Sequence, residues 1–439
     1  KRQDEVRGEI EKLHKGLAEI APGENVDDAD NLRRLAWTEQ TLMLLGGGHL
    51  REVVKLTTKH LADFPSDTRA INNQAEALYQ SGRWEEALKS LDRSIACDNA
   101  NYYAHANRCR IRFLRGLAEL SDRDADLLGK LQPRQASDLT KAAEAFAFRG
   151  EDARVLATCE RLHTENWQGD SPKDSALLYH FAAVAHCRRG DGRQAKKLWK
   201  QSIRHSDSIS FAEDNLNDLR TPVSERSGPF YFSLEYWVSF DVFEELAELS
   251  EVFADDDSDE SSENVDRLFK KLLSRHPHLQ GLVPALLDRG DRLSQMIATE
   301  LATRFPTRET TDALVSFIRS SRGTDSIRYQ TALALKQRGL LLDGELEMIV
   351  GGKVSRVALL DFKITDEPNV PPSRDPEVER LAESAYEALQ SGDGLAAEEQ
   401  LRRAVELDSD CLLYTSPSPR DCGPDLVCRL LLENGGGGG

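Results

Sequence analysis

Two histidine-containing sequences come closest to a catalytic or metal-binding motif. His276 and His278 flank Pro277, and paired histidines can begin a zinc site when further ligands stand nearby. No third ligand is close in sequence, so a turn or a helix N-terminus explains this triplet better. His186 precedes Cys187, two residue types that can form a nucleophilic dyad, but no orienting partner accompanies them. Neither sequence predicts a reaction.

Other chemical signatures are missing or incomplete. The chain has no Gly-x-Ser-x-Gly elbow, no phosphate loop and no dinucleotide fingerprint, and the glycines at 46–48 lack a following Lys-Ser/Thr. The acidic run 255–263 lacks the central glycine and the twelfth-position glutamate of a calcium loop. We expect that run to be a solvated, disordered loop. The sequence therefore predicts a protein that is not an enzyme and that holds no metal and no cofactor.

The charge and composition limit the classes of partner that the chain can bind. The 57 basic and 75 acidic residues give a net charge of −18. Such a chain repels nucleic acid and anionic membrane surfaces. No apolar run approaches the ~18 residues that a membrane-spanning helix needs. We therefore expect protein or peptide partners, with neither nucleic acid nor membrane among them.

The cysteines indicate a reducing compartment. Three of the seven lie in the atypical segment after Asp410, and the other four form no Cys-x-x-Cys. These are Cys97, Cys109, Cys159 and Cys187. We expect free, buried thiols and a cytoplasmic location.

A regular spacing reveals the elements of the fold. Gly48, Gly82 and Gly116 are separated by 34 residues, and so are Ala75 and Cys109. A glycine can take the left-handed backbone that ends a helix, and small residues allow two helices to cross closely. This period predicts repeated pairs of antiparallel helices.

The second repeat resembles the tetratricopeptide family. Residues 79–88 read Tyr-Gln-Ser-Gly-Arg-Trp-Glu-Glu-Ala-Leu, which matches that family almost residue for residue. Trp37 stands at the aromatic position of an earlier repeat, and Pro65 follows its second helix. The resemblance implies an all-α, elongated superhelical solenoid whose first helices, the A helices, line a concave groove that binds other proteins.

We divide the chain into segments according to how closely each follows the 34-residue repeat pattern. The third repeat departs from it in its second helix, near 117–131, and about six residues are inserted between Gly150 and Gly190. The predicted divisions are a partial repeat and linker (1–33), a tetratricopeptide array (34–131), similar repeats (132–228), HEAT-like or degenerate helical repeats (229–343), a β-hairpin and linker (344–372), and a last tetratricopeptide repeat (373–410).

Two features interrupt the repeats. Eight of the 29 aromatic residues fall between Phe230 and Phe253, which predicts either an aromatic ligand groove or, as we favour, a packing junction between two helical arrays. Residues 345–364 read as two strands joined by Gly351-Gly352. This mixture is loosely similar to long bacterial repeat proteins.

The resemblance places a candidate binding surface on the A helices of the second and third repeats. Aromatic and arginine side chains there could anchor a peptide. The candidates are Arg69, Asn72, Asn73, Glu76, Tyr79, Tyr103, Asn107, Arg110 and Phe113. Some family members grip the carboxylate end of a chaperone tail, and Asn73 with Asn107-Arg108 matches part of that clamp. Glu76 would repel such a carboxylate, so we expect no chaperone-tail binding.

The end of the sequence resembles something other than protein. Residues 411–439 resemble a translated sequencing adapter, its flow-cell primer and a poly-glycine run, in that order. We expect the natural protein to continue beyond Asp410 and to begin before Lys1. The predicted function is a non-catalytic interaction scaffold. The alternative is a regulatory or targeting region of a larger enzyme or sensor.

Overall fold

A computed structural model describes residues 29–164, 172–206, 210–246, 259–341, 345–359 and 394–407, together with single helical positions between 377 and 388. The predicted partial repeat before residue 29, the linker at 360–376 and the adapter-like end lie outside the described residues. The chain divides into two compact units at Asp361. We describe each unit by itself.

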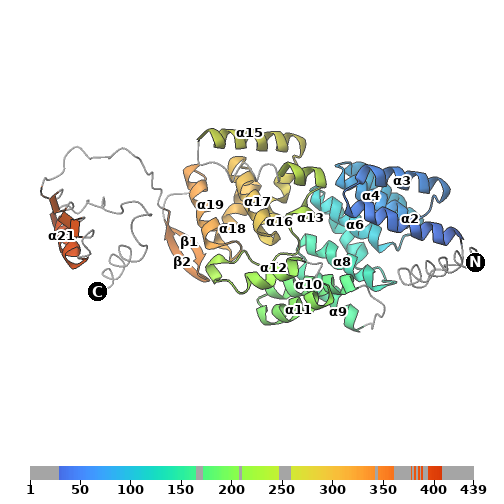
Figure 1. Cartoon of the computed structure of the whole chain (residues 1–439), viewed down its shortest axis with the longest axis horizontal. Coiled ribbons are helices and arrows are strands. Elements are labelled where there is room, and N and C mark those ends of the chain that lie inside the picture. Colours follow the sequence, from blue (N-terminus) through green and yellow to red (C-terminus); the bar gives the residue numbers. More distant parts are fainter. Residues whose placement is uncertain are drawn as a thin grey trace, which may run out of the picture. The chain divides into compact units, whose positions relative to one another are not determined.

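The described part of the first unit starts, at residue 29, with five pairs of helices (Figure 1). In each pair the first helix is the A helix and the second is the B helix. The pairs are α2 (Ala29–Gly46) with α3 (Leu50–Asp63), α4 (Thr68–Gln80) with α5 (Trp84–Cys97), α6 (Tyr102–Leu114) with α7 (Ala118–Leu128), α8 (Ala136–Arg149) with α9 (Asp152–Thr164), and α10 (Pro172–Arg188) with α11 (Gly192–His205). The prediction of repeated helix pairs is confirmed.

The turn between α4 and α5 shows why the period is built on glycine. Gly82 has a φ of +74°, and the backbone N–H of Arg83 reaches back to the carbonyl of Leu78 at 2.8 Å. That left-handed residue reverses the chain and satisfies a carbonyl that the helix leaves unpaired. Ala75 and Ala87 are fully buried where the two helices cross. The 34-residue period of the sequence therefore corresponds to the spacing of the turns and of the helix crossings.

The helices that follow in this unit vary in length. They are α12 (Ser210–Asp218), η1 (Val223–Glu225), α13 (Leu234–Trp237), α15 (Asp259–Arg275), α16 (Leu279–Arg289), α17 (Arg292–Arg304), α18 (Arg308–Arg319) and α19 (Asp325–Gln337). One expectation was wrong: residues 259–263 of the acidic run are not a loop but the first turns of α15. Acidic residues are favourable there because the helix dipole places positive charge at its N-terminus.

A two-stranded hairpin follows α19. Strand β1 (Glu345–Val350) pairs antiparallel with β2 (Lys353–Ala358), and Val350 lies opposite Lys353. Gly351 and Gly352 form the turn with φ values of +56° and +82°. The hairpin predicted from the sequence is confirmed, and β1 packs against α18.

In the second unit, α21 (Gly394–Leu407) is the helix with defined bounds, and Ala385 and Ala397 are buried. Across the described part of the chain, no helix is both long and apolar enough to cross a membrane.

Candidate functional site

The nine candidate residues lie on α4 and α6, as predicted, but they are not all exposed. Arg69 is exposed, and five others are half-buried: Asn72, Asn73, Glu76, Tyr103 and Phe113. The remaining three are buried, with exposed fractions of 4% for Tyr79, 8% for Asn107 and 6% for Arg110. The expectation of an exposed face was therefore wrong at Tyr79 and Arg110, whereas Asn107 was a candidate through its partial match to the carboxylate clamp. Whether any of the nine contacts a partner stays a prediction.

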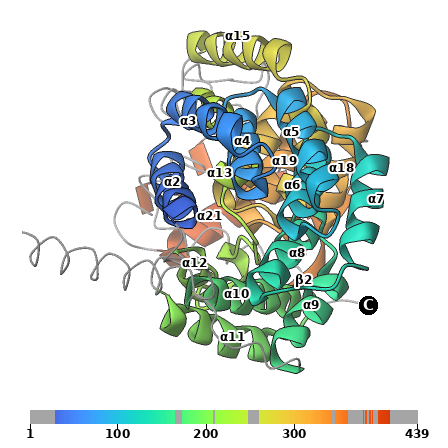
Figure 2. The same ribbon diagram turned by 90° about the vertical axis from the view of Figure 1, so that its right-hand side faces the viewer.

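A later segment of the same chain covers part of the A-helix face. We call residues 230–241, which include α13, the returning segment. Figure 2 shows α13 inside the curve formed by the A helices. The ring of Phe232 stacks on that of Phe148 of α8 with 4.1 Å between centroids, and the Trp237 ring meets Phe148 edge-on at 5.2 Å. These aromatics form the junction favoured from the sequence.

His180 of α10 holds the start of the returning segment. Its Nε2–H donates to the carbonyl of Tyr231 at 2.9 Å, and its Nδ1 accepts from Trp199 Nε1–H at 3.3 Å. Because Trp199 can only donate, these contacts require the neutral Nε2–H tautomer. Burial lowers the pKa of His180 to about 4, which agrees with a neutral ring.

Ion pairs connect the start of the returning segment to helices α15–α19, which we call the second helical array. The Tyr231 hydroxyl donates to Asp152 at 2.7 Å, and Arg188 bridges from Asp152 to Asp288 of α16 at 3.0 and 2.9 Å. Burial raises the pKa of Asp288, but the charges of Arg188 and other nearby arginines outweigh burial and hold that pKa below its usual range. The arrays are thus joined by polar contacts as well as by aromatic rings.

The other end of the returning segment reaches the first two repeats. The backbone N–H of Phe240 donates to Gln80 Oε1 of α4 at 3.1 Å. The Asp241 carboxylate lies beside the turn glycine Gly82, and the Phe240 ring lies beside Gly48. The segment therefore crosses the A helices from α10 past α8 to α4, in the reverse of their order along the chain.

Arg289, at the end of α16, contacts both α8 and the middle of the returning segment. Its guanidinium donates twice to the carbonyl of Phe148, at 3.1 and 2.9 Å. The same group lies 5.5 Å from the ring of Phe113 and 5.7 Å from that of Trp237. Burial lowers the pKa of Arg289. A buried cation needs such acceptors and aromatic faces, because it has lost its water.

Charged residues beneath the returning segment are paired with one another. Arg110 forms an ion pair with Glu76 and lies over the rings of Tyr79 and Phe148, at 5.4 and 5.9 Å. Burial lowers the pKa of Arg110, but the carboxylates of Glu76 and Glu144 outweigh it and raise the pKa overall. The Glu76 carboxylate that argued against a carboxylate clamp is thus matched by a cation of the next repeat.

The asparagines on these helices have structural contacts. The side-chain amide of Asn72 donates to Asn101 at 3.3 Å, and the Asn101 side chain accepts from Ala104 at the start of α6. Asn73 Nδ2 is buried and, within the described residues, has no hydrogen-bond partner. The Asn72 contact links the second repeat to the capping residue of the third.

The two chemical motifs of the sequence have structural surroundings of their own. His278 is the N-cap of α16 and contacts Arg115 at 2.9 Å, whereas His276 lies 3.6 Å from Glu245. Burial raises the pKa of the Cys187 thiol, which opposes formation of a nucleophilic thiolate. In the described ranges no group of three or more possible metal ligands occurs. Of the four cysteines there, all unpaired, Cys109 and Cys159 are buried as expected, Cys187 is half-buried, and Cys97, against expectation, is exposed.

The sequence did not point to three residues of this site. Gln80, Asp152 and Arg289 hold the returning segment, yet as single polar residues they carry no local signal. The aromatic spacing between Phe230 and Trp237 gave the only hint that something packs there.

No protein-family model and no curated protein sequence matches the chain. Among solved structures it is similar to a human IFIT1 dimer with PPP-AAAA, at 11% identity and a TM-score of 0.35, over 93% of this chain and 80% of that one. It is also similar to the P58(IPK) TPR domain, at 11% identity and a TM-score of 0.21, over 85% of this chain and 92% of that one. These likenesses concern helical architecture and do not bear on what the chain binds.

Proposed function

We propose that this protein is a non-catalytic interaction scaffold that binds a peptide or protein partner on the concave face of its helix pairs. The observation that supports this most is the returning segment. The A helices already hold another stretch of the chain, through side-chain contacts to its backbone from His180 and Gln80 and through ring stacking on Phe148. A groove can bind a separate peptide through contacts of the same kinds.

The partner would use the exposed rings of the returning segment itself, together with the part of the face that this segment leaves open. Tyr236 and Phe240 are 40% and 44% exposed, and Leu42 of α2 is 48% exposed. Half-buried Tyr103 lies 5.7 Å from the ammonium of Lys141. Aromatic rings beside a cation are frequent binding hot spots, since they bury a large area with few rotatable bonds.

Other features agree with this role. The buried, protonated thiols and the neutral core histidine offer no activated nucleophile or base. The four unpaired cysteines of the described ranges suit the cytoplasm, and the acidic charge suits a protein partner better than nucleic acid.

Selection of a displayed peptide library on the full chain tests the proposal. Affinities of selected peptides would be measured for the protein and for the Tyr103→Ala, Phe240→Ala and Arg69→Ala variants. We expect a loss of about tenfold or more for at least the aromatic variants. Lys89→Ala, on the exposed side of α5, is the matched control and should change nothing. Peptides that bind all variants equally would overturn the proposal.

A further inference from the structure

The third and fourth repeats pack together through their A helices, α6 and α8, but α7 stands apart from α8. Helix α7 barely touches α8, whereas α3, α5 and α9 each pack closely against the next A helix. The sequence gives a reason at two positions. Leu91 and Ile95 of α5 pack into the core, and the residues one period later are Ala125 and Gly129. Two large apolar side chains are thus replaced by a methyl group and a hydrogen.

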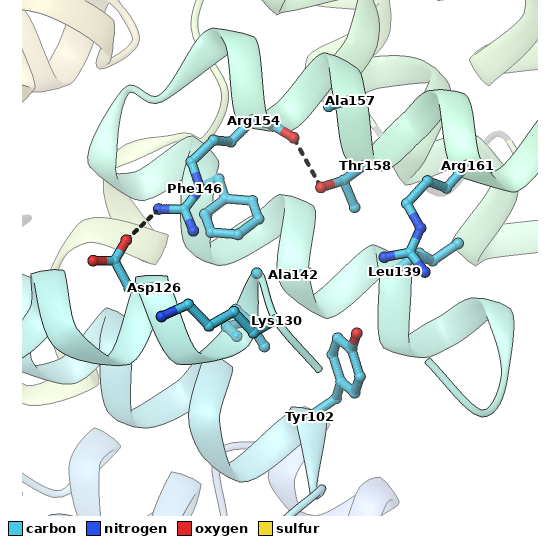
Figure 3. A pocket seen from close by; sticks show the side chains of 12 residues that line it. Tyr102, Asp126, Lys130, Leu139, Ala142, Phe146, Arg154, Ala157, Thr158 and Arg161 are labelled. Carbon is cyan, nitrogen blue, oxygen red and sulfur yellow. Dashed lines mark hydrogen bonds and ion pairs between the residues drawn. The ribbon is translucent and has the colours of Figure 1, made fainter. Parts of the chain in front are cut away.

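The separation leaves a pocket of about 300 Å³ between α7 and the α8–α9 pair (Figure 3). Part of its wall is apolar and is formed by the buried residues Leu128, Leu139, Ala142 and Phe146. This volume is at the lower end of small-molecule sites, which combine such a wall with a few polar groups.

The rim of the pocket is positively charged. Lys130, Arg154 and Arg161 line it, Asp126 is the one carboxylate among its lining residues, and Glu151 beside the pocket pairs with Arg154 at 3.0 Å, so 3 − 2 gives a local charge of +1. In a chain with a net charge of −18 this is a local reversal of sign.

The rim groups differ in how firmly they are held. The Arg154 guanidinium lies 4.2 Å from the ring centre of Phe146 and donates to the carbonyl of Ala125 at 2.6 Å. It also approaches Asp126 at 3.4 Å, which neutralises that carboxylate. Lys130 is exposed, and Figure 3 shows its side chain lying between those of Asp126 and Tyr102. A flexible ammonium there can move onto a bound anion.

We propose that this pocket binds a small organic acid with a flat apolar body and a single carboxylate. The body would lie against Leu139, Ala142 and Phe146, and the carboxylate would meet Lys130 and Arg161. A monoanion suits this rim because it matches the single excess positive charge.

Calorimetric titration of the full chain with 2-naphthoate, phenylacetate and indole-3-acetate tests the site, with the neutral amide of each acid as its matched control. We expect at least one acid to bind with a millimolar or better Kd, and its amide to bind about tenfold more weakly. Lys130→Glu should remove the preference for the acid. Ala157→Phe should block binding, and because Ala157 is exposed at the rim, this change leaves the core intact.

Lys89→Glu, a charge reversal on α5 away from the pocket, should leave binding unchanged. The proposal is overturned if no acid binds at millimolar concentration, if acid and amide bind alike, or if neither rim variant alters the affinity. Because every probe is a small molecule read out by direct binding, failure here is distinguishable from failure of peptide binding on the concave face.

Discussion

The ring of Phe232 lies on the ring of Phe148 with 4.1 Å between centroids and 12° between planes. Phe148 belongs to the last turn of α8, and one residue, Ser233, lies between Phe232 and the start of α13. Phe232 also forms a β-bridge with Gly290, which follows α16. This one stack therefore joins the concave face, the returning segment and the second helical array.

Phe232→Ala should be among the most destabilising single changes in the returning segment. Phe232 is 2% exposed, and removing a buried phenylalanine ring costs about 3–5 kcal/mol. Tyr236→Ala is the control, since Tyr236 is 40% exposed and should lose about 1 kcal/mol. Urea denaturation of both variants measures the difference. Equal losses would contradict the view that the stack is the main contact of the returning segment.

His180 should make stability depend on pH. Its pKa is lowered by burial to about 4 in the folded chain, against about 6.5 when unfolded. Between these values the unfolded state binds a proton that the folded state does not. The free energy of unfolding therefore falls as the pH decreases from 6.5 to 4, by up to about 3 kcal/mol from this group.

The comparison with His180→Gln isolates that effect. The variant should be less stable near neutral pH and should lose less stability than the wild type between pH 6.5 and 4. Burial, aided by Arg115, lowers the pKa of His278 to about 3, so part of the slope should remain. His205→Gln, at an exposed position, is the control. Parallel curves for wild type and His180→Gln would contradict the assignment.

The pair of Arg110 with Glu76 should show strong coupling. Each single change, Glu76→Gln or Arg110→Met, leaves one half-buried or buried charged group without its main partner, and we expect losses of about 2 kcal/mol each. The double variant should lose less than the sum, by about 1–2 kcal/mol, because neither charge then stays unpaired. A double-mutant cycle in urea measures this, and additive losses would show that the pair is not coupled.

Most of the fold could be predicted from local patterns in the sequence. The spacing of Gly82 and Gly116 predicted turns because left-handed backbone has a strong residue preference. The Gly351-Gly352 turn predicted the hairpin for the same reason. Helical spacing also placed the candidate residues on α4 and α6.

The cover over those residues could not be predicted this way. The Phe148 ring lies beside Arg110 and packs against Trp237 of α13, which is remote in the chain, and no local preference encodes a remote contact. The start of α15 was missed because a run of acids indicates a loop unless it is known to stand at a helix N-terminus.

Two glycines of the fourth repeat region should respond in opposite ways to the same substitution. Gly129 has helical backbone, with φ −67° and ψ −16°, and an added methyl group would meet the end of the Arg154 side chain, which can move aside. Gly129→Ala should therefore stabilise the chain by about 0.5–1 kcal/mol, because it restricts the unfolded state. Gly150 has a φ of +72°, and a methyl group there would lie 3.1 Å from the Arg289 guanidinium, whose position the Phe148 carbonyl fixes. Gly150→Ala should cost about 1–2 kcal/mol. Thermal and urea unfolding of the two variants side by side checks both signs, and a loss at Gly129 equal to that at Gly150 would mean that Arg154 is held as rigidly as Arg289.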